Sequence, residues 1–197
     1  MRQLVVLVGL PGSGKTTFRR RHPDWATVSK DDIRRTVFRR DFDPDYEDAV
    51  ERIFAAMLVE AVDSPAEVVC VDSTNLSQCE RRLLVEVARL SEREALAHVM
   101  PMLSIDALYE RKLQQLTALA HDEPDIRVGG FPRERYEMMA SRYEAVSEEE
   151  GFFRVIHEAP PPVPAPARAP RTKPKRARRS RRRTTEPQLN PLPLFAP

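Results

Sequence analysis

The stretch GLPGSGKT at residues 9–16 decides the fold of this chain, because it has the spacing G-x-x-x-x-G-K-[ST] of a phosphate-binding loop. An apolar run, LVVLV at residues 4–8, precedes it, and TTFRR at residues 16–20 can open a helix. A strand before the loop and a helix after it are the context that this motif requires. The alternative is a Gly-rich turn that occurs by chance. Such a turn would require neither the fixed spacing of the motif residues nor a strand before it and a helix after it.

This loop is expected to hold the phosphates of ATP. Its glycines have no Cβ, so the backbone can curl tightly and point successive N–H groups at a polyphosphate. Lys15 would reach the β- and γ-phosphates, and Thr16 would place its hydroxyl on Mg²⁺. The expected nucleotide-binding residues are Gly9, Pro11, Gly12, Ser13, Gly14, Lys15, Thr16 and Thr17.

Strand and helix patterns alternate along residues 1–158, which we expect to form one domain. Apolar runs predict strands at 3–8, 26–29, 68–71, 98–103 and 152–156. Amphipathic periodicity and capping residues predict helices at 43–62, 78–90, 104–120 and 132–149, besides two that begin near 16 and 31. This alternation predicts a three-layer α/β sandwich of the P-loop NTPase type, with a parallel sheet of about five strands.

Polar clusters follow the first three predicted strands. They are the phosphate-binding loop, KDDIR at residues 30–34 and DSTN at residues 72–75. Ligands of such sheets bind at the carboxyl ends of the strands. We therefore expect the three clusters to meet at one edge of the sheet.

The order of GLPGSGKTT, SKDDIRR and VDSTNLSQCERR resembles the 5′-kinase domain of the polynucleotide kinases and its relatives among the AAA-type P-loop kinases. The resemblance covers residues 1–158. The first segment is shared by very many NTPases, and the other two narrow the match. The resemblance implies transfer of the γ-phosphoryl group of ATP to a hydroxyl, namely the 5′-hydroxyl of DNA or RNA.

The resemblance also implies roles for the polar residues. Asp31 would act as general base on the acceptor hydroxyl, and Arg34, one helical turn later, would contact the acceptor's phosphate. Asp72 and Asn75 would lie around the acceptor, and Asp72 could also hold a Mg²⁺-bound water. DSTN has one more residue between Asp and Asn than some relatives show. The alternatives are that Asp31 caps a helix beside a solvated Arg34, and that Asp72 is structural.

Kinases of this type close a lid that brings an arginine onto the transferring phosphate. Arg127, beside Gly129 and Gly130, is the first candidate here, and Arg111 is the second. Relatives carry an arginine-rich lid in this region, whereas this chain has the uncharged residues QQLT at 114–117. Arg81 and Arg82 are expected to form a solvated helix face.

Residues 159–197 have the composition of a disordered tail, with 11 of the 18 prolines. They carry ten Lys/Arg against one acid, whereas residues 1–158 carry 22 basic and 29 acidic residues. The basic tract at 173–183 predicts contact with nucleic acid, or else a solubilising role. The end, QLNPLPLF from Gln188 to Phe195, loosely resembles the peptides with which bacterial replication and repair proteins dock onto the sliding clamp.

Two further expectations concern location and alternative functions. The two cysteines and the lack of a long apolar run predict a cytoplasmic protein without a membrane span. Two other functions remain open at this point. One is a small-molecule kinase acting on a sugar, nucleoside or antibiotic hydroxyl. The other is a non-catalytic ATP-binding module tethered to nucleic acid or a clamp.

Overall fold

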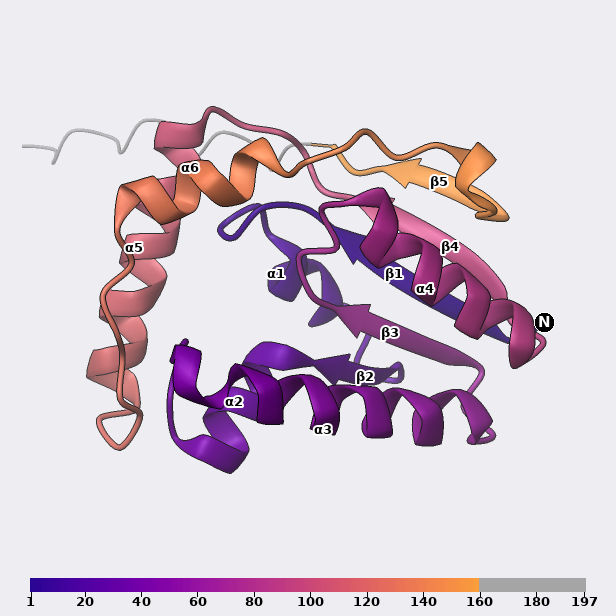
Figure 1. Ribbon diagram of the computed structural model, residues 1–197, viewed down its shortest axis with the longest axis horizontal. Coiled ribbons are helices and arrows are strands. Elements are labelled where there is room, and N and C mark those ends of the chain that lie inside the picture. The colour runs from indigo at the N-terminus through magenta and orange to yellow at the C-terminus, as the bar shows by residue number, and fades with distance from the viewer. Residues whose placement is uncertain (160–197) are drawn as a thin grey trace, which may run out of the picture. The chain divides into compact units, whose positions relative to one another are not determined.

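The computed structural model describes residues 1–159 (Figure 1). The predicted basic tract and the apolar C-terminal motif lie outside the described residues. Strands and helices alternate through the described part, as their sequence patterns predict. Among these residues, no helix has both the length and the apolar character needed to cross a membrane.

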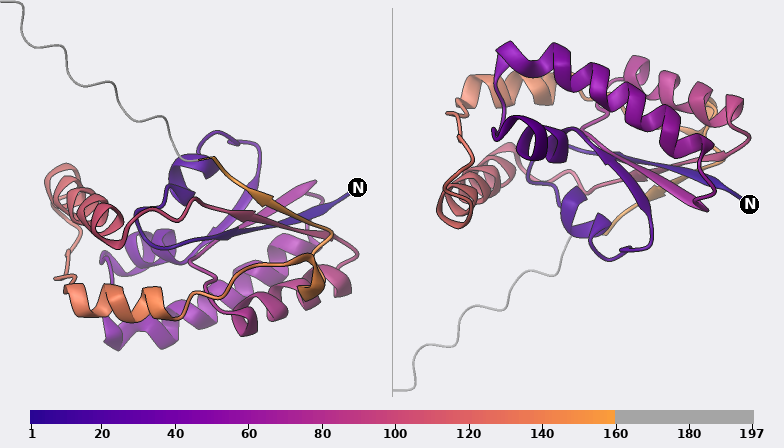
Figure 2. Two further views of the ribbon diagram at one scale, coloured as in Figure 1. Left: turned by 90° about the horizontal axis from the view of Figure 1, so that it is seen from above. Right: turned by 90° about the horizontal axis from the view of Figure 1, so that it is seen from below.

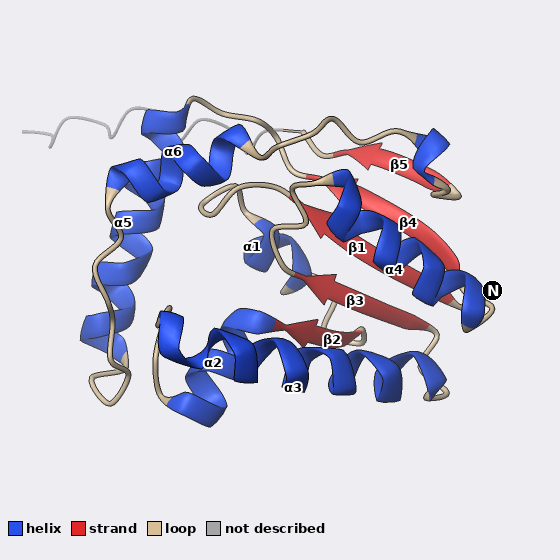
Figure 3. Cartoon of the chain, viewed as in Figure 1, coloured by secondary structure: helices blue, strands red, loops and turns tan. Residues whose placement is uncertain are grey.

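One sheet of five strands forms the centre of the fold, in the order β2-β3-β1-β4-β5 (Figure 3). All four strand pairs are parallel, which confirms the predicted α/β class. Asp72 pairs with Leu7 on one side and with Ser29 on the other, so β1, β2 and β3 end at the same level. The strands are β1 (Gln3–Val8), β2 (Ala26–Ser29), β3 (Val68–Asp72), β4 (Glu94–Val99) and β5 (Arg154–His157).

Side-chain caps define where several helices begin. Ser29 and Ser104 accept hydrogen bonds from backbone N–H groups of the first turns of α2 and α5. Asp43 does the same for α3, in which Pro44 takes the first helical position, and Ser77 forms a capping box with Glu80 in α4. The helices are α1 (Lys15–Arg19), α2 (Lys30–Phe38), α3 (Pro44–Asp63), α4 (Gln78–Leu90), α5 (Ile105–Asp122) and α6 (Arg133–Ser141), with a 3-10 turn at Glu148–Glu150.

Alternate residues of β1 face two apolar layers. Leu4 and Val6 pack with Phe54 of α3 and Leu84 of α4, whereas Val5 packs on the other side of the sheet with residues that include Phe18 of α1. The views from above and below show α3 and α4 along one face of the sheet and α1 on the other (Figure 2). The result is the predicted three-layer sandwich.

The helices α5 and α6 stand beyond the carboxyl ends of the strands rather than on a face of the sheet (Figure 1). A third apolar cluster joins them to the phosphate-binding loop and to the connection that follows β3. It contains Leu10 of the phosphate-binding loop, Leu76 after β3, Leu108 of α5 and Tyr136 of α6. These contacts place α5 and α6 over the edge at which the site forms.

Two predicted boundaries are wrong. The fourth strand is Glu94–Val99 rather than 98–103, because the sequence ALA at 95–97 favours helices locally yet pairs with β1. The last helix ends at Ser141 rather than near 149. Beyond it the chain turns back to the core, where Val146 is buried and the backbone N–H of Glu144 bonds to the carbonyl of Leu76.

Candidate functional site

The ends of β1, β2 and β3 open into a cavity of about 440 Å³. Its lining comes from the phosphate-binding loop, the start of α2, the α2–α3 connection, the end of β3, and the helices α5 and α6. The predicted convergence of the three polar clusters on one edge is therefore confirmed. Of the expected nucleotide-binding residues, six line the cavity: Pro11, Gly12, Gly14, Lys15, Thr16 and Thr17.

Left-handed backbone at two glycines shapes the phosphate-binding loop. Gly12 has φ +81°, and a Cβ at this position would lie 2.5 Å from the carbonyl oxygen of Leu108. Gly14 has φ +107°, and a Cβ there would meet nothing within 4 Å. The loop thus passes close to α5 on one side and leaves open space on the other. At position 12, only glycine can adopt this left-handed backbone and also lie so close to Leu108.

Gly9 and Ser13 belong to the loop but do not line the cavity. A Cβ on Gly9 would come within 2.7 Å of the Ser13 hydroxyl and 2.9 Å of Met100. The Ser13 hydroxyl is buried and has no hydrogen-bond partner within the described part of the chain.

Lys15 is buried at the base of the cavity. Its ammonium group donates hydrogen bonds to the carbonyl oxygens of Gly9 at 2.6 Å and Leu10 at 3.0 Å. Burial lowers the pKa of Lys15 to about 8, although the carboxylates of Asp72 and Asp31 act in the opposite direction. A phosphate anion would compensate for this desolvation, so the Lys15 environment favours anion binding.

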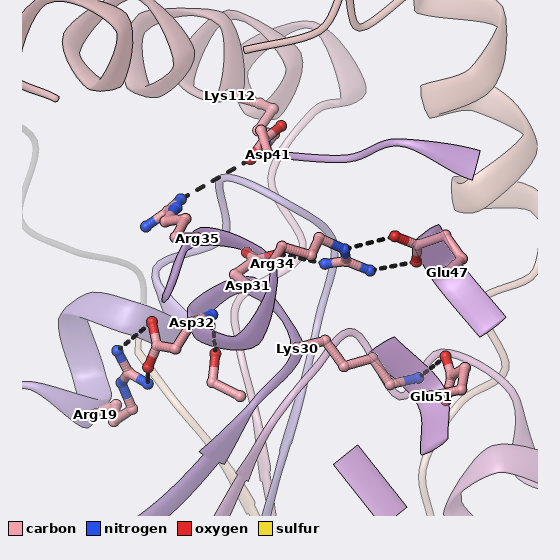
Figure 4. A network of polar contacts seen from close by, with 11 residues as sticks. Arg19, Lys30, Asp31, Asp32, Arg34, Arg35, Asp41, Glu47, Glu51 and Lys112 are labelled. Atoms are coloured by element: carbon pink, nitrogen blue, oxygen red, sulfur yellow. Dashed lines mark hydrogen bonds and ion pairs between the residues drawn. The ribbon is translucent and has the colours of Figure 1, made fainter. Parts of the chain in front are cut away.

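Asp31, Arg34 and Glu47 form a connected ion-pair network on the α2–α3 side of the cavity (Figure 4). The Arg34 guanidinium donates two parallel bonds to Glu47, at 2.8 and 2.7 Å, and one to Asp31 at 2.6 Å. Burial would raise the pKa of Asp31, but the positive charges of Arg34, Lys112, Arg35 and Lys15 outweigh it and lower that pKa. Asp31 is therefore an ionised carboxylate facing the cavity.

A second network joins α1 to the ends of β2 and β3. Arg19 contacts Asp32 at 2.5 Å (Figure 4) and also lies 3.5 Å from Asp72. Burial raises the pKa of Asp72, against the opposing charges of Lys15 and Arg19. The two acids of the DD pair thus differ in their contacts, since Asp31 faces the cavity and Asp32 holds Arg19.

The expectation that Asn75 binds the acceptor is not supported by its geometry. The side chain is buried, outside the cavity lining, and its amide donates a 2.7 Å hydrogen bond to the carbonyl oxygen of Leu7. Its backbone has φ +48°, a conformation that asparagine tolerates better than most residues. Asn75 therefore ties the β3–α4 connection to β1.

Neither sequence-predicted candidate for the lid arginine lines the cavity. Arg127 is exposed and outside the cavity lining, because its backbone pairs with the α2–α3 connection at Arg39 and Asp41. Arg111 also lies outside the lining, next to Gly12. The side chains that α5 and α6 bring to the cavity are Lys112, Gln115, Arg135, Met138 and Met139, and Arg142 follows α6. Sequence reasoning missed all three of these cations, and Arg135 had no motif to mark it.

Arg81 also departs from expectation, because it is fully buried rather than part of a solvated helix face. Its guanidinium bonds to Glu150 at 2.7 and 2.8 Å and to the carbonyl oxygens of Asn75 and Leu76. Arg82, the next residue, is exposed as expected. Arg81 thus supports the connection that follows β3 at the cavity edge.

The site chemistry fits Mg²⁺ bound together with nucleotide. Among the described residues no group of three or more His, Cys, Asp or Glu could hold a metal ion. Mg²⁺ in such sites takes one or two protein oxygens and completes its shell with phosphate and water. Thr16 and Asp72, the two predicted ligands, both line the cavity.

Comparison with known proteins agrees with the fold. A family model described as an AAA domain matches residues 4–119, which is more than half of the chain. No curated protein is similar enough to match. The fold resembles a chain of the Pnkp1/Rnl/Hen1 RNA repair complex with a TM-score of 0.56 and 21% identity. That alignment covers 72% of this chain and 43% of the other, so this chain spans less than half the length of that one.

Two further solved structures share the fold. A candidate kinase from Chloroflexus aurantiacus aligns with a TM-score of 0.58 and 17% identity, over 79% of this chain and 86% of that one. A chain of the PezAT toxin–antitoxin system of Streptococcus pneumoniae aligns with a TM-score of 0.51 and 15% identity, over 64% and 56%. At these identities the likeness shows a P-loop kinase-like fold.

Proposed function

This chain belongs to the AAA domain family, and we propose that it is an ATP-dependent kinase that phosphorylates the 5′-hydroxyl of DNA or RNA. One observation carries the proposal. A single cavity contains both the phosphate-binding residues Lys15 and Thr16 and the ionised carboxylate of Asp31. A donor phosphate and an acceptor hydroxyl bound in this cavity would lie within reach of groups suited to each.

The phosphate-binding loop supplies positive charge to the donor. Protonated Lys15 would leave the carbonyl oxygens of Gly9 and Leu10 to contact the β- and γ-phosphates, and the loop's N–H groups would surround them. Mg²⁺, held by Thr16 and through water by Asp72, would neutralise charge on the phosphate oxygens when bound. Arg19 keeps Asp72 oriented toward this position.

Asp31 orients the acceptor and receives its proton. The lowered pKa makes Asp31 a weak base that stays ionised at neutral pH. Such a carboxylate is adequate here, because phosphoryl transfer proceeds through a loose transition state in which the attacking hydroxyl needs orientation more than early deprotonation. The bond from Arg34 fixes one carboxylate oxygen of Asp31.

Support for a nucleic-acid acceptor comes from three sources. They are the resemblance of residues 1–158 to polynucleotide kinases, the fold shared with a chain of an RNA repair complex, and the ten cations of residues 159–197. We propose that the basic tract at 173–183 contacts nucleic acid and that QLNPLPLF at 188–195 docks on a sliding clamp. Both contacts would raise the local concentration of the nucleic acid and would take no part in the reaction.

A small-molecule acceptor is the second candidate, and one observation favours it. The α2–α3 side of the cavity presents the carboxylates of Asp31, Asp41, Glu47 and Glu51. These groups accept hydrogen bonds and would suit a neutral polyhydroxyl acceptor such as a sugar.

One assay separates these functions. Purified protein, Mg²⁺ and γ-labelled ATP are incubated with hydroxyl-ended oligonucleotides and, separately, with sugars, nucleosides and aminoglycosides. We expect label to appear at the 5′ end of the oligonucleotide, and Lys15→Ala to abolish the transfer while the circular dichroism spectrum is unchanged. Label on a small alcohol alone would establish the second candidate. ATP binding without transfer to any acceptor would indicate a non-catalytic module.

A further inference from the structure

Three arginines line the cavity, and two of them are already engaged by carboxylates. Arg34 bonds to Glu47 and Asp31, and Arg142 pairs with Glu80 at 2.8 Å. Arg135 has no ion-pair or hydrogen-bond partner within residues 1–159. Within the described part of the chain it is therefore the cavity arginine whose N–H groups are available to a ligand.

An aromatic stack holds the Arg135 guanidinium in place. Its central carbon lies 3.2 Å from the centre of the Phe42 ring and 5.3 Å from that of Phe131. Stacking uses the flat faces of a guanidinium and leaves its N–H edges free to bind an anion in two-pronged fashion. Arg135 is thus oriented without using any of its N–H groups for a hydrogen bond within residues 1–159.

The helix that carries Arg135 is bonded to the phosphate-binding loop. Tyr136, the next residue of α6, is fully buried and donates a 2.8 Å hydrogen bond from its hydroxyl to the carbonyl oxygen of Pro11. This bond ties the first turn of α6 to the loop that holds the donor. The position of Arg135 relative to the donor is therefore set by the fold.

Phe42 also places Arg135 on the acceptor side. The same ring lies 5.7 Å from the Arg34 guanidinium carbon, and Arg34 bonds to Asp31. Arg135, on α6, thus approaches the wall that carries the proposed base. A ligand group at Arg135 would belong to the acceptor rather than to the adenosine of ATP.

Arg34 and Arg135 also differ in the charge that surrounds them. Arg34 with its two carboxylates carries a net charge of −1, so an anion would be repelled by that network. Near Arg135, Lys112 is buried and stands 3.8 Å from Asp41, beyond hydrogen-bond distance. Within residues 1–159, the cations available to an anion on this side are Arg135 and Lys112.

We propose that Arg135 binds a phosphate group of the acceptor and that Arg34 is a positioning residue for Asp31. This inference rests on the proposed function, because a phosphate next to the reacting hydroxyl is a feature of nucleic-acid acceptors. It assigns recognition of the acceptor phosphate to α6 instead of to the helix that carries the base.

The test compares Arg135→Gln with Arg34→Gln, using Arg133→Gln as a matched control. Arg133 lies on the same helix, outside the cavity lining, and pairs with Asp106 and Glu137. The acceptors are a nucleoside 3′-phosphate and the same nucleoside without the phosphate. We expect Arg135→Gln to raise KM about 10- to 100-fold for the phosphorylated acceptor alone, as for loss of a charge-assisted bond. Arg34→Gln should lower kcat on both acceptors.

A second measurement needs no turnover. Inorganic phosphate is titrated by NMR into the full chain while a non-hydrolysable ATP analogue fills the phosphate-binding loop. Weaker phosphate binding in Arg135→Gln, but not in Arg133→Gln, supports the site even if the wild-type protein phosphorylates no oligonucleotide, an outcome that would sink only the proposed function. Unchanged phosphate binding in Arg135→Gln, or an equal rise in KM for both acceptors, overturns the inference. Arg135→Lys, which retains a cation, keeps the test valid if the Gln variant unfolds.

Discussion

Lys15 couples ATP binding to pH. Because burial lowers its pKa to about 8 in the free protein, Lys15 loses its proton as the pH rises through 8, and the neutral amine no longer attracts phosphate. ATP binding must then take up a proton, so the dissociation constant should rise above pH 8, approaching about tenfold per pH unit. Calorimetric titration between pH 6.5 and 9.5, in two buffers of different ionisation enthalpy, measures both the affinity and the uptake. An affinity that stays flat to pH 9.5 would contradict this prediction.

Asp31 should act on the acceptor rather than on the nucleotide. We expect Asp31→Asn to reduce turnover by about 10²- to 10⁴-fold, the range of general-base contributions, and to leave ATP affinity nearly unchanged. Asparagine keeps the size of the side chain but removes its charge and cannot take the proton. Single-turnover kinetics at saturating ATP, together with equilibrium ATP binding, checks both parts. Collapse of ATP affinity with normal chemistry would make Asp31 a nucleotide ligand.

The helix α4 depends on the buried guanidinium of Arg81. Replacing Arg81 with Met would strip Glu150 of its partner and leave a buried carboxylate uncompensated, because the Glu150 side chain in this pair is only 3% exposed. We expect Arg81→Met to lower the free energy of unfolding by about 3–5 kcal/mol. Urea denaturation of this variant and of Arg82→Met, an exposed neighbour on the same helix, measures the difference. Equal stability of the two variants would show that the pair contributes nothing to the fold.

The division between residues 1–158 and 159–197 predicts separate roles in catalysis and retention. Every residue that we place in the reaction lies in residues 1–142, so removing 159–197 should leave turnover of short oligonucleotides nearly unchanged. Retention on long nucleic acid should weaken, and the loss should shrink as salt rises, because up to ten cations would be removed. Affinity for a long single strand across a salt series, with and without the segment, measures this. Identical salt slopes would favour a protein partner for the segment.

Local patterns were sufficient for the order of elements and for the phosphate-binding loop. The glycines, Lys15 and Thr16 act within eight consecutive residues, and strands that alternate with helices admit few sheet topologies. The meeting of the loop with Asp31 and Asp72 was also predictable, because parallel strands end at one edge. The shifted fourth strand was not, because its helix-favouring ALA segment pairs with a distant strand.

The partners of the polar side chains were decided by tertiary contacts. Arg34 meets Glu47 across 13 residues, Asn75 turns to Leu7 across 68, and Arg81 reaches Glu150 across 69. The sequence shows that these residues are charged or polar, but not which group compensates each of them once water is removed. Burial makes that pairing obligatory, since an uncompensated charge is costly in the interior. The three-dimensional fold also places Arg135 of α6 against Phe42 and in the cavity lining, and within residues 1–159 its N–H groups have no hydrogen-bond partner.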